Sequence, residues 1–102
     1  MLSLQLNVKL QTELKLKKIL QYTQDEESFA QNIISYQIAE LQKGILNLEL
    51  DLKEFEEKYK ISSEEFYQDF LRGAAGDSED FIIWSGIYEM FRENNARLME
   101  LR

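Results

Sequence analysis

The sequence lacks three residue types, and each absence excludes a kind of structure or chemistry. It contains no cysteine, so disulfide bonds and thiolate metal sites are excluded. It contains no histidine, which removes the most common general base and the most common zinc ligand. It also contains no proline, the usual helix breaker, and this absence suits long uninterrupted helices.

Several functional signals are also missing. No segment approaches the roughly 20 apolar residues of a membrane span, and the first residues do not have the pattern of a secretion signal. No phosphate loop, dinucleotide fingerprint or nucleophile–base pair is present, and Asp77, Glu79 and Asp80 do not have the spacing of a calcium loop. We therefore expect a cytoplasmic protein that is not an enzyme, with no catalytic residue, metal, cofactor or membrane partner.

The composition fits one small folded domain with an uneven distribution of charge. The chain has 102 residues, of which 44% are hydrophobic and 12% aromatic, and these values argue against disorder. Acidic and basic residues balance over residues 1–45, whereas residues 46–102 hold the whole excess behind the net charge of −7. The sequence therefore predicts two functional regions, 1–45 and 46–102, of which the acidic second one would suit a basic protein partner.

Apolar and polar side chains alternate over residues 2–11. This period of two predicts a β-strand with one buried and one solvated face. A lone strand leaves its backbone unpaired, and the chain offers no second strand, so we expect pairing with the same strand of another copy. The core of the predicted homodimer consists of Leu4, Leu6, Val8, Ile34 and Ile38.

The remainder of the chain reads as helices. A short helix is predicted over about residues 13–22, with Thr12 as its N-cap. A long helix follows over about 26–59, capped by either Thr23 or Asp25. Its apolar residues repeat in heptads, and Gly44 marks either a break or a close approach between helices. The heptad positions are Ile34, Ile38, Leu41, Ile45, Leu48, Leu52, Phe55 and Tyr59.

Two further helices complete the predicted fold. Ser62 is the expected N-cap of the first, and Gly73 is expected to end it in the left-handed conformation. Asp77 or Ser78 would cap the last helix. The fold class is therefore mainly α with one N-terminal β-strand.

The order of strand, short helix and longer helix over residues 2–45 resembles that of ribbon-helix-helix proteins of the Arc and MetJ type. The resemblance implies a two-stranded antiparallel ribbon in the major groove, with Gln5, Asn7 and Lys9 facing the bases. Amide side chains can pair with adenine and lysine with guanine, although such a polar face can also be merely solvated. The acidic stretch 25–27 would repel phosphate, so we expect weak to moderate binding to operator DNA.

Residues 55–66, Gly73 and residues 80–84 resemble parts of antitoxins of type II toxin–antitoxin systems. The resemblance implies that the N-terminal dimer represses an operon and that the acidic helical tail neutralises a basic protein toxin. The predicted partner-binding residues are the aromatic side chains Phe66, Phe70, Phe81, Trp84 and Tyr88. The alternative is that these side chains pack in the protein core. The alternative function is a homo-oligomeric coiled-coil structural or adaptor protein without DNA binding.

Overall fold

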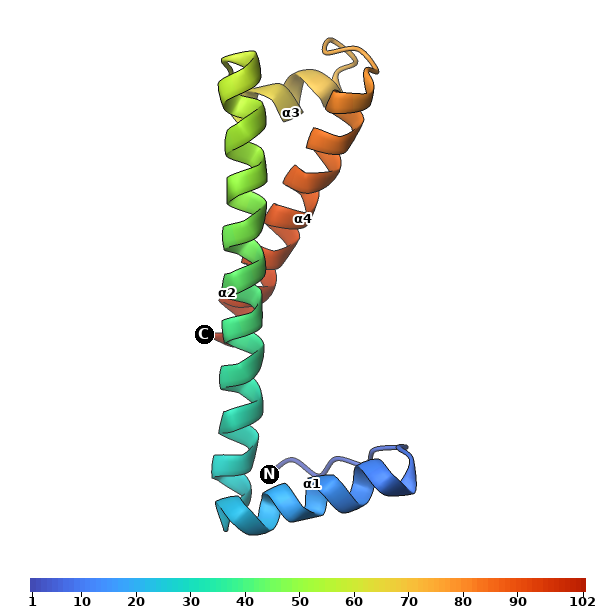
Figure 1. Cartoon of the computed structure of the whole chain (residues 1–102), viewed down its shortest axis with the longest axis vertical. Helices are drawn as coiled ribbons and strands as arrows, with labels where there is room; N and C mark the ends of the chain where they lie inside the picture. The colour runs from blue at the N-terminus through green and yellow to red at the C-terminus, as the bar shows by residue number, and fades with distance from the viewer. The chain divides into compact units, whose positions relative to one another are not determined.

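The computed structural model describes residues 1–102, and all of its regular secondary structure is helical. Four helices follow one another along the chain (Figure 1): α1 (Leu10–Thr23), α2 (Glu26–Tyr59), α3 (Ser63–Leu71) and α4 (Glu79–Leu101). The chain divides into two compact units, Met1–Tyr36 (unit 1) and Gln37–Arg102 (unit 2). The division lies within α2, ahead of residue 45, where the sequence predicts the change between the two functional regions.

The prediction of an N-terminal β-strand is wrong. The predicted ribbon-helix-helix architecture is therefore also wrong, because it requires that strand. Residues 1–9 have no regular secondary structure, and α1 begins at Leu10, inside the alternating stretch. Alternation indicates only which side chains share a face, whereas a strand requires backbone hydrogen bonds to a neighbouring strand. The chain contains no such neighbour, and Leu10 and Leu14 equally satisfy the spacing of a helix.

The turn between α1 and α2 is made without glycine. Gln24 adopts the left-handed conformation (φ 64°), and its N–H donates to the carbonyl of Leu20 at 3.0 Å. The Thr23 hydroxyl donates back to the same carbonyl at 3.1 Å, so it does not cap the next helix. Asp25 does so, because its Oδ1 accepts the N–H of Ser28 at 2.8 Å.

The start of α1 also differs from the prediction. Lys9, in extended conformation, is the N-cap and makes no side-chain cap bond, so Thr12 lies inside the helix. The helix therefore begins earlier than a search for polar caps indicates.

Helix α2 runs unbroken from Glu26 to Tyr59, as predicted. A Cβ placed on Gly44 would lie 3.7 Å from Asn94 Nδ2 of α4, which is an ordinary van der Waals distance. Gly44 therefore marks a place where α4 comes near α2 rather than a break. From Ile45 onward the heptad residues contribute to the core of unit 2, where Ile45, Leu48 and Leu52 are buried.

The caps of α3 and α4 confirm the local predictions. Ser62 Oγ accepts the N–H of Glu65 at 3.1 Å, and Ser78 Oγ accepts the N–H of Phe81 at 3.3 Å. Gly73 follows α3 with φ 76°, and the N–H of Ala74 bonds to the carbonyl of Asp69 at 2.9 Å. This is a Schellman ending, in which the left-handed residue is a glycine.

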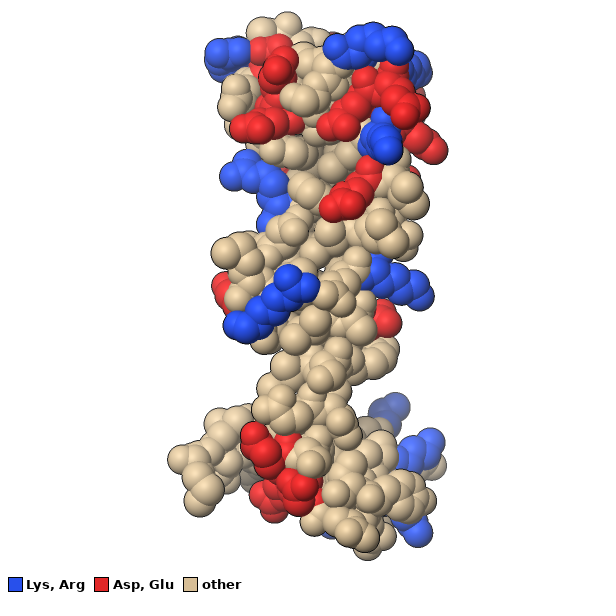
Figure 2. Space-filling view, turned by 90° about the vertical axis from the view of Figure 1, so that its left-hand side faces the viewer, with Lys and Arg blue, Asp and Glu red and all other residues tan.

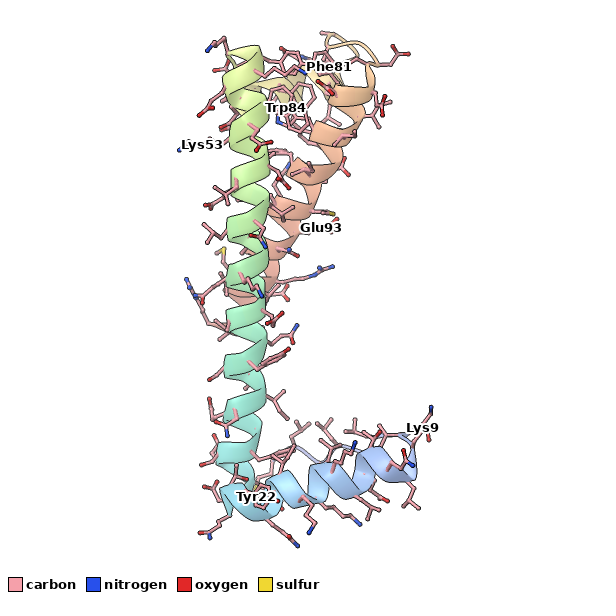
Figure 3. All side chains as sticks on the ribbon, in the orientation of Figure 1. Lys9, Tyr22, Lys53, Phe81, Trp84 and Glu93 are labelled. Carbon is pink, nitrogen blue, oxygen red and sulfur yellow. The ribbon has the colours of Figure 1, made fainter.

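Unit 2 has a core built around one tryptophan. Trp84 is fully buried and stacks on Phe66 with ring centroids 3.8 Å apart, and Leu52 completes the buried cluster. Figure 3 shows Phe81 and Trp84 between α2 and α4, next to α3. The indole N–H donates to Ser63 Oγ at 2.9 Å, so the most buried polar group has a partner.

A candidate protein interface on unit 1

Unit 1 contains no buried side chain. Leu16, Leu20 and Phe29 are only half-buried, and α1 has no buried residue along its whole length. The large apolar side chains of this unit are instead exposed: Met1, Leu2, Leu4, Leu6, Val8, Leu10, Leu14, Ile19, Tyr22, Ile33, Ile34 and Tyr36. Where exposed apolar side chains gather into one patch, they mark an interaction site.

Part of this surface is a groove of about 380 Å³ between the N-terminal segment, α1 and the start of α2. Its apolar lining comes from all three segments and consists of Leu4, Leu6, Val8, Leu16, Leu20, Phe29 and Ile33. Leu4, Leu6 and Val8 are 73%, 65% and 43% exposed, so they border the groove without closing it. The groove is open to further apolar contacts.

The structure brings together part of the predicted dimer core. Leu4, Leu6 and Val8 line the groove, whereas Ile34 and Ile38 do not. Ile34 is exposed on α2, and Ile38 is half-buried in the other unit.

Four apolar residues of the groove were not singled out from the sequence as site residues. The pairs Leu16/Leu20 and Phe29/Ile33 each follow the i, i+4 spacing that places side chains on one helix face. That spacing is the signal by which they could have been found. The spacing alone does not show whether this face is covered or left open.

The predicted DNA-binding residues are exposed and lie near the chain's N-terminus. Gln5 and Asn7 belong to the segment without regular structure, and Lys9 precedes α1 (Figure 3). No sheet holds them on a common face, so the ribbon that was expected to present them to base edges is absent.

The predicted partner-binding aromatics lie in and around the core of unit 2. Phe66 and Trp84 are buried, whereas Phe70, Phe81 and Tyr88 are half-buried and pack against that cluster. Tyr67 and Tyr88 contact each other with ring centroids 5.0 Å apart. These aromatics hold α2, α3 and α4 together, which is the alternative use that the sequence left open.

Charges on unit 1 balance around the apolar groove. Residues 1–36 carry four lysines and four acidic residues. At the groove, Glu13 and Lys17 form an i, i+4 ion pair at 3.8 Å. At the turn, two hydrogen bonds from Ser28 lower the pKa of Asp25, so its carboxylate stays charged beside the positive end of α2. A surface without net charge does not repel a second copy of itself.

No grouping of three or more acidic side chains in this histidine- and cysteine-free chain is placed to hold a metal ion. None of the helices combines the length and the apolar character needed to cross a membrane. Comparison with protein-family models, curated proteins and solved structures found no match.

Proposed function

We propose that this chain is a self-associating protein-binding module in which unit 1 joins copies of the chain. The observation that carries the proposal is that unit 1 folds without a single buried side chain. Segments of fewer than about 40 residues usually need disulfides, metals or oligomerisation to hold a fold. Cysteine is absent and no metal-binding group is formed, which favours oligomerisation as a means of stabilising unit 1.

A second copy is the partner that fits this surface best. The groove offers apolar contacts from three segments, and the unit has no net charge to oppose the approach of an identical unit. A two-fold interface uses the same patch on both chains, and its apolar centre is rimmed here by an existing ion pair.

The test is the mass of the chain in solution, measured by light scattering over a range of concentrations. We expect the wild-type chain to have a multiple of 12.1 kDa and the double variant Leu6→Ser/Ile33→Ser to have 12.1 kDa. The matched control is Leu46→Ser/Leu50→Ser, which changes side chains of similar exposure in unit 2 and should keep the wild-type mass. A wild-type chain of 12.1 kDa at every concentration would contradict the proposal.

A second candidate function is neutralisation of a basic protein toxin by unit 2. The observation in its favour is the charge distribution: residues 37–102 carry eight basic and fifteen acidic residues, which accounts for the net charge of −7. Acidic side chains gather around the end of unit 2 that carries α3 (upper part of Figure 2). Repression of an operon through a β-ribbon is not part of this proposal, because the chain forms no sheet.

The antitoxin hypothesis has a direct test in cells. The product of the neighbouring reading frame should arrest growth when expressed alone, and co-expression of this chain should relieve the arrest. A neighbour that is harmless, or whose toxicity this chain does not change, counts against the hypothesis. Since such toxins are often ribonucleases that act inside the cell, this function would place the chain in the cytoplasm.

A further inference from the structure

A second groove lies in unit 2, between the last turns of α2, the start of α3 and the middle of α4. It measures about 450 Å³ and combines acidic side chains with an apolar floor. The acidic residues are Glu49 and Glu56 from α2 and Glu64 from α3. Leu52, Tyr88 and Phe91 supply the apolar part.

We propose that this groove binds an arginine side chain of a basic protein partner. The inference rests on the proposal that unit 2 binds a basic protein, and it assigns the site of that binding. Guanidinium groups pair with carboxylates and stack on aromatic side chains, and both kinds of side chain line the groove.

The central carboxylate of the groove is already held in position. Glu56 is half-buried, and its Oε2 accepts the backbone N–H of Ser63 at 2.8 Å. The other oxygen, Oε1, is not used in this hydrogen bond, and we assign it to the ligand. Since Ser63 also accepts the indole N–H of the buried Trp84, the orientation of this carboxylate is tied to the core. A carboxylate fixed in this way loses little conformational freedom when a cation binds.

The aromatic floor is also held in place by contacts outside the groove. Tyr88 packs against Tyr67, and the guanidinium of Arg92 lies 5.9 Å from the centroid of the Tyr88 ring. The protein thus already uses a Tyr88–arginine contact of the kind proposed for the ligand. Phe91 lies beside Tyr88 with ring centroids 6.3 Å apart and extends the apolar surface.

One cation of the chain borders the same groove. Lys53, labelled in Figure 3, is exposed on α2 and lines the groove, but it forms no ion pair with the acids there. Its charge opposes the approach of an arginine. Removing it should therefore strengthen binding, whereas removing the acids should weaken binding.

The probe is a short fluorescent tetra-arginine peptide, titrated into the full chain at low salt with fluorescence anisotropy as the readout. We expect Glu49→Gln/Glu64→Gln to weaken binding about tenfold, since two exposed charge contacts are lost. Lys53→Gln should strengthen binding. The control Glu40→Gln/Glu100→Gln has the same net charge as the groove variant but alters acids outside the groove, and it should bind like the wild type.

The outcomes separate the two proposals. If binding weakens equally in the groove variant and the control, the peptide is attracted to the overall charge of unit 2. That result would overturn the proposal that the groove is the binding site. It would not affect the proposal that unit 2 binds a basic protein. A wild-type chain that binds no peptide would overturn both. The emission of Trp84, the only tryptophan, should shift on binding in the wild type, because its hydrogen-bond partner Ser63 lines the groove.

Discussion

Ser63 joins the surface of unit 2 to its core through two hydrogen bonds. Its hydroxyl accepts the indole N–H of Trp84 at 2.9 Å, and its own N–H donates to Glu56. In Ser63→Ala the indole N–H stays buried without a partner, which costs about 1–3 kcal/mol. Chemical denaturation should show this loss. A Ser63→Ala protein as stable as the wild type would mean that the indole finds another partner.

Because of the ion pair between Lys58 and Asp80, the stability of unit 2 should vary with pH in the acid range. Hydrogen bonds from Lys58 and Tyr59 lower the pKa of Asp80 below its ordinary value of 3.8. The stabilisation is therefore complete above that value and is lost as the pH falls through the lowered pKa. Thermal unfolding should find Asp80→Asn less stable than wild type at neutral pH. The two proteins should converge in strong acid, and a constant difference would contradict this account.

At the scale of helices, Gly44 offers a simple test of whether α2 needs flexibility. It lies inside a helix, where glycine costs about 1 kcal/mol relative to alanine. The new methyl group would sit 3.7 Å from the Asn94 side chain, so no clash opposes the change. We therefore expect Gly44→Ala to raise the free energy of unfolding by about that amount. A destabilised variant would indicate that α4 packs more closely on α2 than this distance indicates.

Helices α2 to α4 could be predicted because their signals are local. Ser62 and Ser78 cap helices within a few residues of themselves, and Gly73 ends α3 through its own backbone freedom. The turn at Gln24 was harder, since a residue other than glycine adopts the left-handed conformation there. The strand prediction was wrong because a strand requires hydrogen bonds to a neighbouring strand. The alternation over residues 2–11 does not show whether such a neighbour exists.

The site was less predictable than the helices. Whether Leu16 or Phe29 is core or interface depends on what covers it, and heptad or i, i+4 spacing is the same in both cases. The aromatic residues of α3 and α4 show the same ambiguity. Phe66 and Trp84 are of residue types that are common in interfaces, yet they form the core of unit 2.

At the scale of the molecule, the two units have opposite characters. Unit 2 has a buried core around Trp84 and the whole excess of negative charge. Unit 1 has balanced charge and exposes its apolar side chains. We therefore propose that unit 1 self-associates and that unit 2 binds a basic partner. The central claim is that another copy of the chain stabilises unit 1.

Hydrogen exchange measured at several protein concentrations tests this claim most directly. Backbone amides of α1 should become more protected as the concentration rises, because association stabilises the unit that contains them. Amides of α3 and the first half of α4 should change little, since their core lies within one chain. Protection of α1 that is independent of concentration, in a chain whose mass stays at 12.1 kDa, would contradict the account.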